Sequence, residues 1–163
     1  MIALLVLYVG KADSFILLSY ELLIVFGYIA AISDIKTKTI PNSIVFWMLV
    51  AWVIAIAPKL FFDTDTAVRF LVDSTLGFAI GGGLFLLVYI ISRKGLGGGD
   101  VKYMAGAGLY LGFGKIIPAM LFGTILAAAT GLTLIILKKI GRKDKIPLAP
   151  FLYIGILIVV FLH

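Results

Sequence analysis

The sequence predicts an all-α protein, a polytopic membrane bundle of about six transmembrane helices. Hydrophobic residues make up 63% of the 163 residues and the mean hydropathy is +1.20, so there are too few polar groups to cover a water-soluble globule. The apolar runs are roughly 15–25 residues long, whereas the strands of a membrane barrel would alternate over about ten residues. One bundle of this kind uses the whole length, so residues 1–163 are expected to form a single integral-membrane domain.

Six apolar stretches are candidates for the spanning helices. The apolar segment before them, residues 2–9, is too short to span and lacks the positive start of a cleaved signal peptide. A connecting loop or interfacial turn is expected over residues 61–69. The expected spans are residues 15–33, 43–60, 71–91, 101–113, 116–137 and 147–162.

Basic residues indicate how the chain is oriented. Ten of the fourteen Lys and Arg side chains follow the first, third and fifth spans, and this face is therefore expected to be cytoplasmic. With six spans, both termini then lie outside. Because the basic residues sit in short loops, the net charge of +6 indicates membrane topology, and no nucleic-acid partner is expected.

Composition also limits the chemistry. The chain has no cysteine, and its one histidine is the last residue, His163. Disulfides, thiolate-bound zinc, a histidine-based metal centre and a catalytic triad are therefore not expected. We predict neither a metal nor another cofactor.

Asp34 and Asp100 are the candidate catalytic residues. Two predicted spans separate them, so both fall on the cytoplasmic face. The helix expected over residues 101–113 rises only about 20 Å in a hydrocarbon core of about 30 Å, which places Asp100 below the membrane surface. A carboxylate at that depth is costly unless it faces water or a partner. Two carboxylates held together share a proton and can act as acid and base on one water molecule.

Each of these features also has a structural explanation. Asp100 could cap the helix that it opens, and Asp34 could be a loop carboxylate that balances nearby lysines. The glycines at 97–99 could be a flexible linker, although glycine also permits the close approach of an extended peptide. The pair Gly77 and Gly81, like Gly108 and Gly112, has the spacing typical of close helix packing.

Three segments carry a resemblance to a known family. They are DIKTKTIPN at residues 34–42, GGGDVK at residues 97–102 and IPLAPF at residues 146–151. In order, and each at the cytoplasmic end of a predicted span, they resemble the marker segments of the type IV prepilin peptidases. These are GxGD aspartyl proteases, with archaeal preflagellin peptidases as relatives.

The resemblance implies a catalytic dyad of Asp34 and Asp100, with Gly97 and Gly99 as the fixed glycines of the motif and Lys102 as the basic residue that follows it. It implies an aspartic endopeptidase of the cell membrane. Its substrates would be membrane-inserted pilin, pseudopilin or archaellin precursors, whose short basic leader is removed at the cytoplasmic face after a glycine.

Longer family members carry an insert near the N-terminus, often with paired CxxC motifs, that is associated with methylation by S-adenosylmethionine. Here 33 residues precede Asp34 and cysteine is absent. We therefore expect peptidase activity without N-methyltransferase activity.

A small proton- or ion-coupled transporter, with Asp34 and Asp100 as a relay, is the main alternative. Transporters of that kind tend to place ionisable groups near the membrane midplane within repeated halves. No convincing internal repeat is present, and both aspartates fall toward one face. A purely structural membrane subunit would leave a buried Asp100 unexplained. The sequence predicts no particular oligomeric state.

Overall fold

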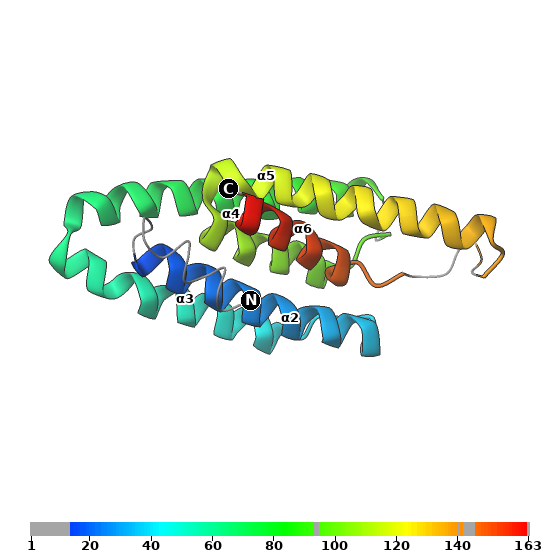
Figure 1. Cartoon of the computed structure of the whole chain (residues 1–163), viewed down its shortest axis with the longest axis horizontal. Coiled ribbons are helices and arrows are strands. Elements are labelled where there is room, and N and C mark those ends of the chain that lie inside the picture. The colour runs from blue at the N-terminus through cyan, green and yellow to red at the C-terminus, as the bar shows by residue number, and fades with distance from the viewer. Residues whose placement is uncertain (1–13, 93–94, 140, 142–145, 163) are drawn as a thin grey trace.

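The computed structural model describes residues 14–92, 95–139, 141 and 146–162, and the regular elements within these ranges are all helices. This confirms the predicted all-α class. The expectations for residues 2–9 and for His163 lie outside the described ranges. Figure 1 shows an elongated bundle whose helices run mainly along one axis. The helices are α2 (Ser14–Thr37), α3 (Asn42–Phe62), α4 (Thr64–Ile91), α5 (Gly98–Ile136) and α6 (Ala149–Leu162).

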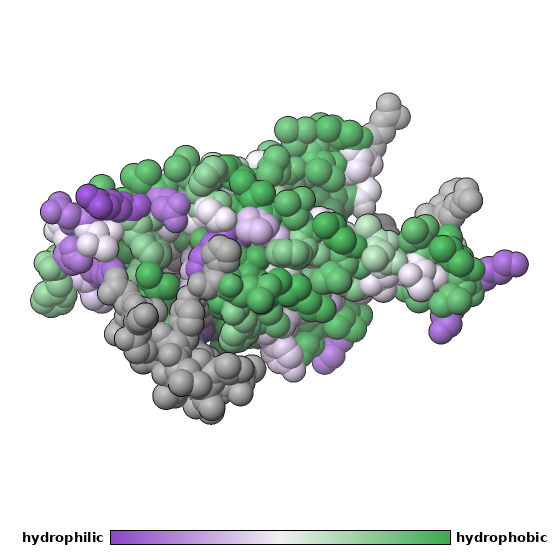
Figure 2. Space-filling view, turned by 45° about the horizontal axis from the view of Figure 1, so that its top comes forward, coloured by the Kyte–Doolittle hydropathy of each residue, from purple (hydrophilic) through white to green (hydrophobic). Residues whose placement is uncertain are grey.

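The surface of the bundle is suited to lipid. Helices α2, α3, α4 and α5 are each long and apolar enough to cross a membrane, and the shorter α6 is also apolar. Large side chains such as Phe46 and Val53 point outward and are more than half exposed. Apolar residues cover most of the face shown in Figure 2. So large an apolar surface would promote aggregation in water, and it identifies a polytopic membrane bundle.

Helix α5 consists of two parts that fold back on each other. Gly112 has φ +69° and ψ −179°, which interrupts the helix. A methyl group placed on Gly81 of α4 would touch both Met104 and Ile116. In a straight helix these two residues would lie about 18 Å apart, so the chain must reverse between them. Figure 1 shows this reversal. Within the described ranges the chain therefore has six helical segments, in the order that the sequence predicts.

The break in α5 is held by a side chain of α4. Asp73 Oδ1 accepts a hydrogen bond of 3.1 Å from the backbone N–H of Phe113, the first residue after Gly112. A side chain at Gly112 would overlap the Asp73 carboxylate and would also require an unfavourable positive φ. Asp73 thus caps the second part of α5 from a neighbouring helix.

Replacing Asp73 with alanine is expected to lower the free energy of unfolding by about 1 kcal/mol, because the Phe113 N–H loses its acceptor. Thermal unfolding of the purified protein in detergent, followed by circular dichroism, measures this change. Asp73→Asn keeps a side-chain oxygen and should retain most of the stability. Equal melting temperatures for Asp73→Ala and the parent would contradict this assignment.

The connecting loop or interfacial turn predicted over residues 61–69 is much shorter in the structure. Helix α4 begins at Thr64, and only Asp63 separates it from α3. Asp63 Oδ1 accepts from the N–H of Thr66 at 3.3 Å, and this hydrogen bonding lowers the pKa of Asp63. Asp65 lies in the first turn, where negative charge favours a helix. The polar residues that suggest a loop are therefore the cap and first turn of α4.

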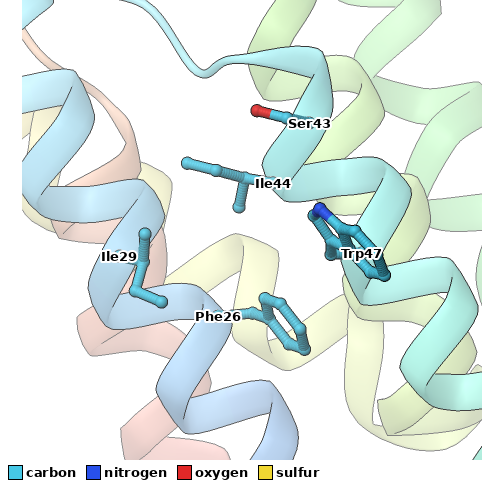
Figure 3. A pocket seen from close by; sticks show the side chains of 5 residues that line it. All are labelled: Phe26, Ile29, Ser43, Ile44 and Trp47. Atoms are coloured by element: carbon cyan, nitrogen blue, oxygen red, sulfur yellow. The ribbon is translucent and has the colours of Figure 1, made fainter.

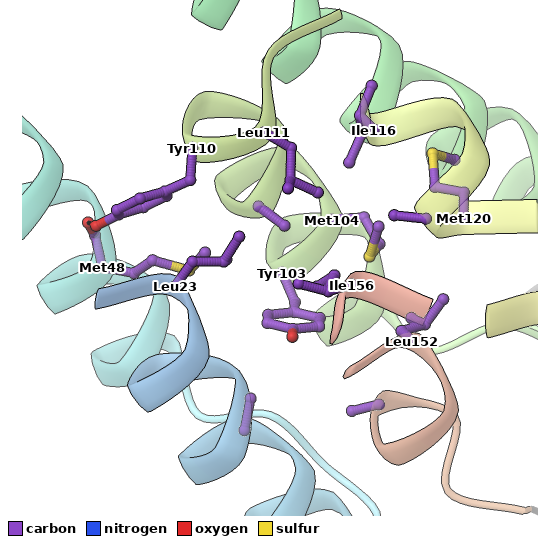
Figure 4. Close-up of a cluster of buried hydrophobic side chains, with 14 of the residues drawn as sticks. Leu23, Met48, Tyr103, Met104, Tyr110, Leu111, Ile116, Met120, Leu152 and Ile156 are labelled. Carbon is purple, nitrogen blue, oxygen red and sulfur yellow. Dashed lines mark hydrogen bonds between the residues drawn. The ribbon is translucent and has the colours of Figure 1, made fainter. Parts of the chain in front are cut away.

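The core lies where α5 meets the other helices. The labelled side chains in Figure 4 come from α2, α3, α5 and α6 and form one buried apolar cluster. Two hydrogen bonds fix α3 against α5: the Tyr110 hydroxyl donates to the Met48 carbonyl, and the Trp52 indole N–H donates to the Leu109 carbonyl. Because α5 contacts each of its neighbours, it sets the positions of the helices around it.

Glycines bring the backbones of α4 and α5 into contact. A methyl group on Gly77 would overlap the backbone of Gly108, and one on Gly108 would overlap that of Gly77. The packing role predicted from the spacing of these glycines is confirmed.

Candidate functional site

Asp34 lies in the last turn of α2. The predicted span, residues 15–33, therefore ends four residues too early, because α2 continues to Thr37 and ends where Lys38 adopts φ +53°. The Thr37 hydroxyl donates to the Ser33 carbonyl at 2.8 Å within this last turn. Asp34 is only 5% exposed, so its carboxylate faces the bundle interior. Asp34 Oδ2 accepts a hydrogen bond of 2.9 Å from the backbone N–H of Ala149, the first residue of α6.

Asp100 lies in the first turn of α5. The helix begins at Gly98, three residues before the predicted start, with Gly97 in an extended conformation at the cap position. The Asp100 N–H donates to the Gly97 carbonyl at 3.1 Å. Asp100 is 8% exposed. Gly98 and Gly99 are therefore helical residues that orient Asp100. They do not form a flexible linker.

The structure brings Asp34 and Asp100 together. The negative charge of Asp34 is close enough to act on the Asp100 carboxylate. The segment between α2 and α3 explains this approach, because Ile40 packs directly on Gly99. The 65 residues between the two aspartates include α3 and α4, which leave the site and return to it.

The two fixed glycines of the motif each leave room for a neighbour. A methyl group on Gly97 would lie 2.7 Å from Asp100 Oδ2, and one on Gly99 would lie 3.1 Å from the Cβ of Ile40. A methyl group on Gly98 would meet nothing within 4 Å. A side chain would therefore be crowded at positions 97 and 99, but not at position 98.

Lys102 is exposed and reaches from α5 to the start of α3. Its Nζ donates to Asn42 Oδ1 at 2.9 Å, which ties the first turns of α5 and α3. Lys102 thus stabilises the approach of the two segments that carry and cover Asp100.

Two contributions to the site carry no sequence signal in their residue type. One is the Ala149 N–H, which binds Asp34 through the backbone. The other is Ile40, an ordinary apolar residue that packs on Gly99. Residues 146–151 were predicted to matter only because of the family resemblance, which assigns them no chemical role.

Two buried carboxylates held close together can exchange a proton with a water molecule between them. Among the described residues, no group of three or more Asp, Glu or His side chains could hold a metal ion.

An apolar cavity of about 420 Å³ lies between α2 and α3. Figure 3 shows Phe26 and Ile29 of α2 facing Ile44 and Trp47 of α3 across it, with Ser43 at its rim. Ile29 precedes Asp34 by five residues, about 8 Å along the helix. The end of the cavity at Ile29 therefore lies within two helical turns of Asp34.

The fold defines a multi-pass membrane protein, and Asp34 and Asp100 are buried within it. The chain belongs to the type IV leader peptidase family, whose model matches residues 21–132. This confirms the resemblance found in the sequence.

Two relatives are clearly similar to this chain. The prepilin leader peptidase/N-methyltransferase of Bacillus subtilis (strain 168) is 30% identical over 128 residues, which cover 78% of this chain and 48% of the relative. A protein of the same name from Legionella pneumophila is 31% identical over 130 residues, which cover 78% and 44%. The chain thus spans about half the length of these curated relatives. No solved structure matches it significantly.

Proposed function

We propose that this protein is an aspartic endopeptidase that removes the leader from prepilin-like precursors, with Asp34 and Asp100 as its catalytic pair. Membership of the family and the names of the relatives support leader peptidase activity. One observation carries the two-aspartate mechanism: both carboxylates are buried and lie within electrostatic range of each other.

In this mechanism a water molecule lies between the two carboxyl groups, which share one proton. The ionised carboxylate takes a proton from the water as the oxygen attacks the scissile carbonyl carbon. The protonated carboxyl gives its proton to the carbonyl oxygen, which yields a neutral tetrahedral intermediate. The carboxyl group that took the proton from water then gives it to the amide nitrogen, and the C–N bond breaks. As the carbonyl re-forms, one hydroxyl of the intermediate gives its proton to the other carboxylate, so the pair again holds one proton.

We infer that the pair faces the cytoplasm. If all six helical segments cross the membrane, the bias of basic residues places the end with Asp34 and Asp100 inside and both termini outside. The scissile bond of a precursor with a basic leader and an apolar helix would lie at the same interface. The lining of the cavity between α2 and α3 is mostly apolar, which suits the apolar helix of such a precursor.

Expression with a membrane-inserted precursor tests this function. The host should lack its own leader peptidase, and the precursor should carry a short basic leader before its apolar helix. Loss of the leader should appear as a shift in size on a gel, and sequencing of the product should place the cut just after a glycine. An intact precursor in the same membrane would contradict the proposal, and it is the result that a transporter would give.

The expected absence of N-methyltransferase activity stays a prediction. The mass of the product tests it, because an unmethylated N-terminus would carry no added methyl group even when S-adenosylmethionine is supplied.

A further inference from the structure

We infer that the first amide of α6 is a positioning group: the Ala149 N–H holds Oδ2 of Asp34 and thereby leaves Oδ1 for the water between the two carboxylates. This inference rests on the proposed function, because it takes Asp34 as catalytic. It assigns a role to the segment at residues 146–151, for which the residue types alone suggest none.

The contact itself is buried and direct. The Ala149 nitrogen lies 2.9 Å from Asp34 Oδ2. The side chain of Ala149 is fully buried, and Asp34 is nearly so. Breaking this hydrogen bond would leave a donor and a carboxylate oxygen unpaired away from solvent, which is costly. The carboxylate is therefore held in one orientation and does not rotate freely.

At the start of α6, the Ala149 N–H is the amide that is available to bind Asp34. Helices begin with N–H groups that have no acceptor within the helix. Here Phe151 and Leu152 both donate to the Leu148 carbonyl, at 3.1 and 3.2 Å. Pro150 has no N–H at all. Of the four residues that begin α6, Ala149 alone directs its N–H to the aspartate.

Helix α6 is in turn fixed on α5, which carries Asp100. A methyl group on Gly123 would lie 2.8 Å from the Cα of Leu152, and one on Gly155 would overlap the backbone of Ala119. Such close backbone packing leaves α6 little freedom to shift. The second part of α5 thus holds α6, and through it the carboxylate of Asp34, while the first part of α5 carries Asp100.

A backbone ester at position 149 tests this role most cleanly. Lactic acid in place of Ala149, incorporated in the full-length chain, replaces only the N–H by oxygen. The matched control is phenyllactic acid in place of Phe151, which removes an amide of the same turn that does not contact Asp34. Helicity and melting temperature show whether both proteins fold. Ala149→Pro provides a second variant, because proline is well tolerated at the first position of a helix.

With a prepilin-like precursor as substrate, the ester at 149 should lower kcat by about 10- to 100-fold with little change in KM, since the carboxylate is misplaced but the precursor still binds. The ester at 151 should keep kcat within about threefold. Equal kcat values for the two esters would overturn the positioning role, and the hydrogen bond from the Ala149 N–H would then serve only to cap α6. If the parent protein cleaves and the ester at 149 has full kcat, the proposed function stands and this inference fails. If the parent itself does not cleave, the proposed function fails first.

Discussion

Replacing either Asp34 or Asp100 with asparagine is expected to abolish leader removal, lowering kcat by about 10³-fold or more. Asparagine has nearly the shape of aspartate but cannot take up or release a proton. If the two carboxylates share one proton and act on one water, neither can work alone. Each single variant should therefore be inactive, and the double variant should lose little more.

The measurement is the rate of leader removal by purified variants in detergent, after confirming that they melt like the parent. Asp65→Asn is a matched control, because Asp65 is an exposed carboxylate in the first turn of α4 and lies outside the site. The Asp65→Asn variant should remove the leader at the parent's rate. A normal rate for Asp34→Asn or Asp100→Asn would rule out the two-aspartate mechanism.

Replacing Gly108 with alanine is expected to destabilise the bundle by about 3 kcal/mol or more. The added methyl group would overlap the backbone of Gly77, and backbone cannot move aside as a flexible side chain can. Helices α4 and α5 would have to separate. Because α5 also carries Asp100, the loss should extend to activity at temperatures where the parent is stable.

Gly83→Ala is the control for this substitution. Gly83 lies in the same helix pair, on α4, and a methyl group there would meet nothing within 4 Å. Alanine favours a helix over glycine, so Gly83→Ala should raise stability by up to about 1 kcal/mol. Thermal unfolding in detergent distinguishes the two. Similar shifts in melting temperature for both variants would show that the contact at Gly108 does not hold α4 against α5.

The order of the helices could be predicted from the sequence because apolar runs of membrane length are distinctive. The even number of runs between Asp34 and Asp100 was enough to place both at one end. The residues at which the helices begin and end were harder to predict. Polar residues at the start of α4 and the end of α2 lower the local hydropathy, yet Asp63 and Thr66 cap one helix, and α2 continues through Asp34 to Thr37.

The detailed site could be predicted only in part. Two acidic residues beside a run of glycines stand out, but a backbone N–H is present at almost every position and has no signature of its own. The contacts of Ala149 with Asp34 and of Ile40 with Gly99 join segments distant in sequence, and they follow from the packing of α6 on α5 and of the segment before α3.

Cysteine labelling tests most directly whether the two aspartates meet at the cytoplasmic face. The chain has no native cysteine, so single substitutions give a clean signal. Lys36→Cys and Gly98→Cys place exposed thiols beside Asp34 and Asp100, and Asp65→Cys marks the other end of the bundle. A membrane-impermeant maleimide should reach positions 36 and 98 only from the cytoplasmic side and position 65 only from the opposite side. Labelling of positions 36 and 98 from opposite sides of the membrane would contradict the account.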